Sequence, residues 1–163
     1  MNQSQDSIVK ILPMWQPWAS FVVWGEKQNE TRSWKPAQNW TGILAILATK
    51  TFQDEAKYLC ATNEFFRRTL EARNFRYDTL KYDLPFGAII GSVELFKVVS
   101  TDSVRDSLSP KEKVFGDYSA GRFAWQLRNH IELKKPISLK GQQGMWTAPD
   151  EIRDAILKSR GIR

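Results

Sequence analysis

Residues 86–99, FGAIIGSVELFKVV, decide the fold, because they form one long run of apolar, mostly β-branched or aromatic residues. Such residues favour a β-strand. Gly87 and Gly91 lie inside the run, and glycines inside a strand are typical of a bulge or of the bend of a small barrel. Glu94 interrupts the same run, and a carboxylate in so apolar a stretch must be paired, hydrogen-bonded or shifted in pKa. We therefore expect a long, bent strand here.

Further strands and helices flank this run on both sides. Apolar or alternating stretches predict strands, and helix-start and helix-stop signals such as Pro17, Gly25 and the T-x-x-D pattern of residues 51–54 predict helices. The expected strands cover residues 8–12, 27–34, 42–48, 122–133 and 137–139, and the expected helices cover residues 17–24, 51–73 and 149–159. This order indicates an α+β fold, a small bent β-barrel with flanking helices. We expect a single domain over residues 1–163, with residues 1–7 flexible.

Two segments carry more specific expectations. Strict alternation over residues 122–133 would place His130 among the polar side chains, as a plain surface histidine. The same alternation would place five apolar side chains on the opposite face, namely Phe123, Trp125, Leu127, Ile131 and Leu133. Residues 100–121 are long and rich in Ser, Asp, Pro and Gly, so we expect a mobile flap with one helical turn near residues 110–114.

Composition bounds the function. The chain has 163 residues, 42% of them apolar, and a net charge of +6, which favours polyanions and nucleic acid above all. Seven tryptophans, four of them in the first 34 residues, suit stacking on bases as well as an ordinary core. No stretch resembles a signal peptide or a membrane span, so we expect a cytoplasmic protein.

The histidine and cysteine content excludes several chemistries. Cys60 is the only cysteine, so no internal disulfide can form, and it is expected to be a buried, inert thiol. A single histidine argues against a Ser–His–Asp site and against a zinc site. We expect no metal and no cofactor.

Polar side chains nevertheless gather between the first predicted helix and the strand after it. Lys27, Glu30 and Arg32 lie close to the tryptophans Trp18 and Trp34. Lys27 or Arg32 is also the expected partner of Glu94. Such a cluster is either a buried ion pair that orders the fold or a functional site.

At these residues the chain resembles a known family. The motifs QPWAS (16–20), GEK (25–27), ETRSW (30–34), TGIL (41–44), ATK (48–50), LPFGAIIGSVE (84–94), FGDYS (115–119), RFAW (122–125) and KG to Trp146 (140–146) occur in order along nearly the whole sequence. Together they resemble the ASCH domain, named for activating signal cointegrator homology.

The resemblance implies a PUA-like fold and recognition of RNA, single-stranded nucleic acid or a modified nucleotide in a basic, tryptophan-lined cleft between the first helix and the barrel. Trp18 or Trp34 would stack on a base, and the lysines and arginines would hold phosphate or a base edge. The candidate ligand-binding residues are Gln16, Pro17, Trp18, Lys27, Glu30, Arg32, Ser33, Trp34, Lys50, Glu94, Arg122 and Lys140.

Two other functions stay open at this point. Some small ASCH-type proteins resemble metal-independent amidohydrolases acting on N4-acylated cytidine, and here Lys27 and Glu94 would be the catalytic residues. Glu30 stands where those enzymes have a threonine, which weakens the hydrolase reading. The third function is a coactivator-like protein-interaction module, which a large exposed apolar patch would favour.

Overall fold

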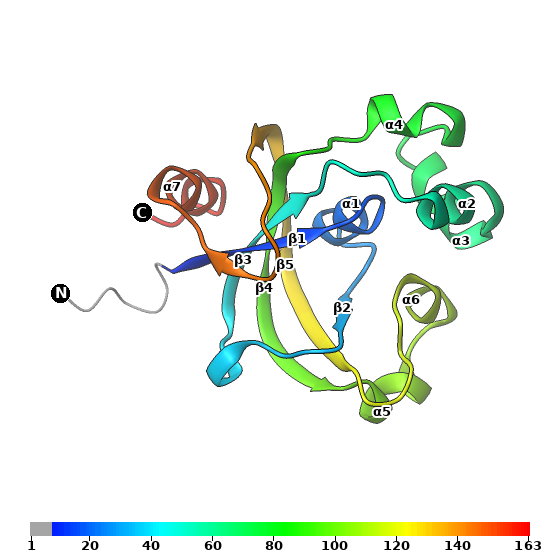
Figure 1. Cartoon of the computed structure of the whole chain (residues 1–163), viewed down its shortest axis with the longest axis horizontal. Coiled ribbons are helices and arrows are strands. Elements are labelled where there is room, and N and C mark those ends of the chain that lie inside the picture. Colours follow the sequence, from blue (N-terminus) through cyan, green and yellow to red (C-terminus); the bar gives the residue numbers. More distant parts are fainter. Residues whose placement is uncertain (1–7) are drawn as a thin grey trace.

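A computed structural model describes residues 8–163, so the expectation that residues 1–7 are flexible lies outside the described residues. Within the described part, strands and helices are interspersed along the chain (Figure 1). The strands are β1 (Val9–Met14), β2 (Asn29–Arg32), β3 (Gly42–Ala48), β4 (Ala88–Ser100), β5 (Phe123–Ser138) and β6 (Trp146–Thr147). The helices are α1 (Trp18–Val23), α2 (Asp54–Thr62), α3 (Glu64–Glu71), α4 (Leu80–Asp83), α5 (Thr101–Val104), α6 (Pro110–Phe115) and α7 (Asp150–Ser159), with short 3-10 turns η2 (Ala37–Asn39), η3 (Tyr77–Thr79) and η4 (Arg105–Ser107).

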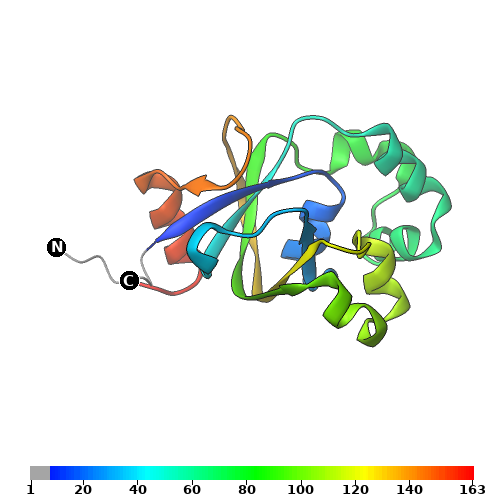
Figure 2. The same ribbon diagram turned by 60° about the horizontal axis from the view of Figure 1, so that its bottom comes forward.

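One mixed sheet organises these elements, in the strand order β2-β5-β4-β3-β1-β6. β1 and β3 are parallel, and the other neighbouring strands are antiparallel. The sheet curls around α1, while α2, α3 and α4 lie at one end of the molecule and α7 at the other (Figures 1 and 2). This curled half-barrel with flanking helices confirms the expected α+β, PUA-like class. No helix of residues 8–163 has the length and apolar character needed to cross a membrane.

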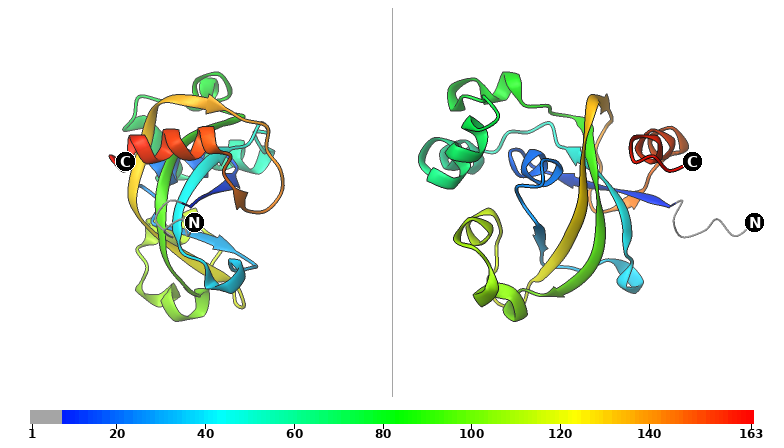
Figure 3. Two further views of the ribbon diagram at one scale, coloured as in Figure 1. Left: turned by 90° about the vertical axis from the view of Figure 1, so that its left-hand side faces the viewer. Right: turned by 180° about the vertical axis from the view of Figure 1, so that it is seen from behind.

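Three apolar clusters hold the layers together. One lies between α1 and the concave face of the sheet and includes Val22, Leu44 and Trp125. A second lies between the opposite face of the sheet and α7, which can be seen from behind in Figure 3. The third joins α1 to the outer helices α2, α3 and α6 through Phe21 and Phe66. Helix α1 is therefore packed on two sides, against the sheet and against the outer helices, and these contacts fix its position.

A bulge in β5 overturns the expected alternation of residues 122–133. Ser92 pairs with Ile131 and Glu94 with Arg128, so β5 has one more residue than β4 between these two pairs. Asn129, in this stretch, has a positive φ of 52°. The extra residue moves every later side chain to the other face. His130 is therefore half-buried against Val22 O instead of lying on the surface, at an Nδ1–O distance of 2.6 Å.

The apolar positions of the strand are divided by the same bulge. Phe123, Trp125 and Leu127 pack against α1, whereas Leu133 and Ile137 pack in the cluster beneath α7. The expectation of one common apolar face was wrong for this reason. Residues 137–139 are not a separate strand either, because β5 runs unbroken to Ser138.

The helix expected over residues 51–73 is broken at Asn63. Its side chain accepts hydrogen bonds from Phe65 N and Phe66 N and begins α3, as asparagine commonly does at a helix start. Helix α2 begins after Gln53 without a side-chain cap, so the expected Thr51–Asp54 capping box does not form. Cys60 is buried as expected, and burial raises the pKa of its thiol to about 12.

Residues 100–121 form α5, η4 and α6 and not an irregular loop. The turn expected near residues 110–114 is α6, and the segment contributes buried side chains, namely Thr101 of α5 and Glu112 and Phe115 of α6. Thr101 Oγ1 donates to Ser119 O and Arg122 O at 2.8 and 3.1 Å. The expectation that residues 100–121 form a loop outside the core was therefore wrong. Their mobility stays a prediction.

Candidate functional site

A cleft of about 820 Å³ opens beside α1, where the end of β1, β2, α2 and the residues after α6 meet. A volume of this size lies within the roughly 300–1,000 Å³ that small-molecule sites occupy. Its lining includes five of the residues predicted from the sequence, namely Trp18, Lys27, Glu30, Arg32 and Arg122.

Two tryptophans form the aromatic wall of the cleft. Trp15 is 51% exposed, and Trp18 is half-buried with its ring edge-on to Phe66, at a centroid distance of 5.8 Å and an interplanar angle of 87°. Trp18 was predicted, but Trp15 was not singled out. Its only signal in the sequence is its position, a large aromatic residue in the short connection between a strand and a helix.

Gln16 and Pro17 support this wall from beneath and do not line the cleft. Gln16 is fully buried, its Oε1 accepts from Ser20 N at 3.0 Å, and its Nε2 donates to Pro85 O at 2.9 Å. The side chain thereby ties the first turn of α1 to the segment before β4. The QPW motif thus builds the site, and only its tryptophan lines the cleft.

β2 and the residues just before it supply alternating charges to the lining of the cleft. Glu30 accepts from Arg32 Nε at 2.9 Å, and Lys27 Nζ lies 3.8 Å from Glu30 Oε2. Lys27 is 1% exposed and donates to Asn29 O, while Arg32 also donates to Pro13 O at 2.8 Å. Glu30 and Arg32 therefore share a face, as expected, and their mutual contacts hold both side chains in defined directions.

Ser33 and Trp34 follow β2 but lie outside the lining of the cleft. Ser33 is exposed, and the ring of Trp34 packs edge-on against Trp125 at 4.9 Å. The carbonyl of Trp34 accepts from Trp125 Nε1 at 3.2 Å. Trp34 is therefore a partly buried residue packed against the core beside the cleft, and its role as a stacking platform stays a prediction.

A buried carboxylate anchors β2 from below, and sequence reasoning missed it. Glu112 of α6 accepts from Asn29 N at 2.9 Å and from Gln28 N at 3.1 and 3.2 Å. The Tyr118 hydroxyl donates to the same carboxylate at 3.4 Å. Burial and the charge of Glu112 raise the pKa of Tyr118. The sequence pattern Ser109-x-x-Glu112 resembles a capping box, and Ser109 does cap α6, but the carboxylate reaches β2.

Arg122 also lines the cleft and is held by several acceptors. Its Nε lies 3.3 Å from the carboxylate of Asp117 and donates to the carbonyl of Asp117 at 3.2 Å, while its Nη2 donates to Thr31 O at 3.4 Å. Hydrogen bonds from Ser119 and the charge of Arg122 lower the pKa of Asp117. The ion pair is therefore maintained at neutral pH.

The expectation of a basic cleft was wrong, because the charges that line it cancel. Among the described lining residues, the cations are Lys27, Arg32 and Arg122, and the carboxylates are Glu30, Glu55 and Asp117. Lys50 and Lys140 are exposed and do not line the cleft, but they are close in sequence to Thr49 and Gln142, which do. Any net attraction for phosphate at this site must come from such surrounding lysines.

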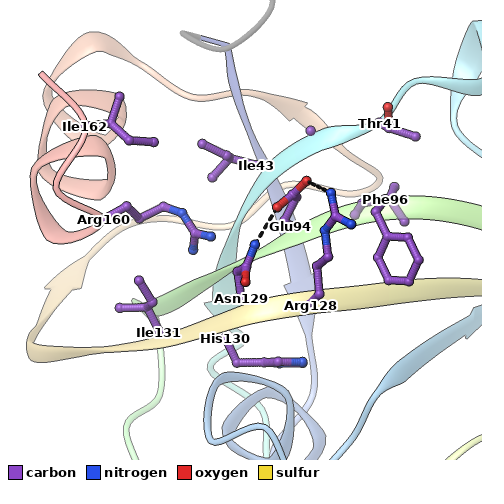
Figure 4. A pocket seen from close by; sticks show the side chains of 12 residues that line it. Thr41, Ile43, Glu94, Phe96, Arg128, Asn129, His130, Ile131, Arg160 and Ile162 are labelled. Atoms are coloured by element: carbon purple, nitrogen blue, oxygen red, sulfur yellow. Dashed lines mark hydrogen bonds and ion pairs between the residues drawn. The ribbon is translucent and has the colours of Figure 1, made fainter.

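Glu94 does not belong to the cleft. It accepts from Arg128 Nη2 at 2.6 Å and from Asn129 Nδ2 at 2.7 Å, and it lines a separate groove (Figure 4). Arg128 and Asn129 lower the pKa of this carboxyl. The predicted pairing of Glu94 with Lys27 or Arg32 was therefore wrong, and the Lys27–Glu94 catalytic pair of the hydrolase hypothesis is not assembled.

Comparison with known proteins identifies the family. The chain is 26% identical over 147 residues to human activating signal cointegrator 1 and 25% identical to the mouse protein; the match covers 90% of this chain but only 23% of each relative. The fold is similar to crystal structures of ASCH from Zymomonas mobilis and of a point variant of it, with TM-scores of 0.56 and 0.54, identities of 16% and 18%, and coverage of 94% of this chain and 96% of theirs. The ASCH domain model matches residues 12–137, and the chain therefore belongs to the ASCH domain family.

Proposed function

We propose that the cleft binds an unpaired base of single-stranded RNA, with the sugar–phosphate chain passing over its rim. The observation that carries this proposal is Trp15, a tryptophan with half of its surface exposed on the wall of a large cleft that also presents paired donors and acceptors. Exposed aromatic rings beside hydrogen-bonding groups are how proteins recognise unstacked bases. The resemblance to PUA-like domains points to the same class of ligand.

The aromatic wall supplies the affinity. Stacking of one base on an aromatic side chain contributes about 1–3 kcal/mol. Trp15 has the exposed surface for this contact, and Trp18 is fixed against Phe66, so it offers a rigid surface beside it. A base inserted along this wall would displace little ordered structure.

The floor supplies the selectivity. Glu30 can accept from an exocyclic amino group, and Arg32 and Arg122 can donate to ring nitrogens or carbonyl oxygens. Glu30 and Arg32 hold each other through an ion pair, and Arg122 is held by Asp117, so the ligand does not have to order these side chains. A balanced set of charges suits a neutral base better than a phosphate.

The phosphate chain would then be held outside the cleft. Lys50 and Lys140 are exposed near the segments that form its rim, and the whole chain carries a net charge of +6. Affinity should therefore fall with salt, but less steeply than for a protein that neutralises many phosphates within its site.

The test is a titration of a short, fluorescently labelled single-stranded RNA at low salt, followed by anisotropy. We expect Trp15→Ala to weaken binding roughly five- to one-hundred-fold, as the loss of one stacked base predicts. Tyr82→Ala is the matched control, because Tyr82 is 75% exposed but lies outside the cleft. Arg122→Gln should also weaken binding, with Lys134→Gln on β5, the strand that follows Arg122, as its control.

A duplex of the same sequence separates stacking from general charge attraction. Its bases are already stacked, so it should bind more weakly than the single strand. Equal binding of both, together with no effect of Trp15→Ala, would show that RNA is attracted by charge alone and that the cleft is not its site.

A further inference from the structure

A second groove of about 790 Å³ lies between the sheet and the last turn of α7, and none of its lining residues belongs to the cleft. Figure 4 shows its polar floor, where Arg128, Asn129 and Arg160 point toward Glu94. These side chains come from β4, from β5 and from the residue that follows α7. The groove is therefore assembled by tertiary structure and not by one local motif.

The bulge of β5 builds the floor of this groove. Because Asn129 is the extra residue, Arg128 and Asn129 both reach Glu94, whereas in a regular strand they would point to opposite faces. His130 is turned to the far side, toward α1 (Figure 4). Bulges that redirect side chains in this way are frequent next to functional sites.

Arg160 adds a second cation, which lies near Glu94 without forming an ion pair with it. It is partly buried, and burial lowers the pKa of its guanidinium. Within residues 8–163 its side chain makes one hydrogen bond, from Nη1 to Ser92 Oγ at 2.9 Å, and no ion pair. A guanidinium has five N–H donors, so most of the donors of Arg160 are free for a ligand.

The charges of the groove leave room for one anion. Both carboxylate oxygens of Glu94 are already occupied, by Arg128 and Asn129. Arg128 and Arg160 together exceed Glu94 by one positive charge among the described lining residues. The 40%-exposed ring of Phe96, with the Arg128 guanidinium 4.8 Å from its centroid, offers a flat apolar surface at the same groove.

We propose that this groove is a phosphate-binding site that accepts the terminal phosphate of a nucleotide, with Arg160 and Arg128 as its donors and Phe96 beside the base. Guanidinium groups bind phosphate through paired hydrogen bonds, and an aromatic ring next to them accommodates the attached base. The site is independent of the cleft. Its phosphate can belong to a free mononucleotide or to the end of an RNA chain.

The first experiment uses calorimetry to measure the binding affinities of adenosine 5′-monophosphate, adenosine and inorganic phosphate. It is carried out on the Trp15→Ala protein, because the cleft of this variant no longer offers its stacking surface. We expect the nucleotide to bind, inorganic phosphate to bind more weakly, and adenosine to bind least. A 5′-phosphorylated RNA that binds more tightly than its unphosphorylated form would identify a chain end as the ligand, whereas equal binding of the two would identify the free nucleotide.

Three variants locate the phosphate. Arg160→Gln should lower the affinity for the nucleotide about tenfold or more, because charge-assisted hydrogen bonds are lost. Lys158→Gln removes the same charge from the exposed face of α7 and should change the affinity less than about twofold. Glu94→Gln should tighten binding, since it removes the anion that competes for Arg128.

A replacement variant is available if Arg160→Gln does not fold. If thermal unfolding shows that Arg160→Gln no longer folds, Arg128→Gln replaces it, because Arg128 is exposed on β5. The proposal is overturned if adenosine binds as well as its monophosphate, if Arg160→Gln and Lys158→Gln have equal effects, or if Glu94→Gln weakens binding. Failure of RNA binding in the cleft would leave each of these measurements unaffected.

Discussion

Replacing Glu112 by alanine should destabilise the protein strongly, although the residue lies in a short helix near the surface. The substitution removes the acceptor of Asn29 N and Gln28 N, which the carboxylate binds at 2.9 and 3.1 Å. Hydrogen bonds to a charged group contribute about 1.5–3 kcal/mol each. Water can reach the exposed Gln28 and offset part of the loss, so we expect about 3 kcal/mol less free energy of unfolding.

Urea denaturation followed by tryptophan fluorescence measures this loss. Glu112→Gln keeps one oxygen acceptor and should cost about 1 kcal/mol. Glu64→Ala is the control, because that glutamate also lies in the first turn of a helix but makes only an exposed ion pair with Arg68, which contributes well under about 1 kcal/mol. A loss from Glu112→Ala no larger than that from Glu64→Ala would refute the role of Glu112 as the anchor of β2.

Three further predictions concern individual residues. Cys60 should resist alkylation at pH 8 in the native protein and react only after denaturation, because burial raises its pKa to about 12; rapid native labelling would contradict this. Arg128 and Asn129 depress the pKa of Glu94 below its usual 4.5, so the stability that this carboxylate contributes is present above pH 4.5 and is lost as the pH falls through the lower folded value. Denaturation at several pH values should therefore show a constant difference between wild type and Glu94→Gln above about pH 5 and a shrinking one in acid, and a difference independent of pH would exclude the ion pair. In hydrogen exchange, the amide of Thr101 should be protected without ligand, since it donates to Arg122 O at 2.9 Å. Exchange as fast as in an open loop would instead indicate that residues 100–121 form a mobile flap.

The sequence contained enough information for the class of fold and for most of its strands. Long apolar runs predicted β3 and β4 with nearly correct bounds, and Gly25 ended α1 as expected, with a φ of 76°. The bulge at Asn129 could not be predicted, because every large apolar residue of β5 falls at an odd number and a regular strand satisfies that pattern equally well. Only the need to cover two separate cores, one beneath α1 and one beneath α7, selects the bulged strand.

The site was predictable where its residues are neighbours in sequence. Glu30 and Arg32 lie on β2 and Lys27 just before it, so alternation alone placed Glu30 and Arg32 on one face. Glu94 was wrongly grouped with these residues. Its partner Arg128 comes from the pairing of β4 with β5, which cannot be seen in a single sequence. Trp15 and Glu112 were missed for a related reason, since their roles depend on elements that meet only in the folded chain.

The most direct test of the account is to record the indole N–H signals of the seven tryptophans by NMR while a short single-stranded RNA is added. Single-tryptophan substitutions assign each signal. We expect the signals of Trp15 and Trp18 to shift as the RNA binds, while that of Trp125, buried in the core, stays in place. Saturable binding that leaves Trp15 and Trp18 unshifted would contradict the proposal that this cleft holds the base.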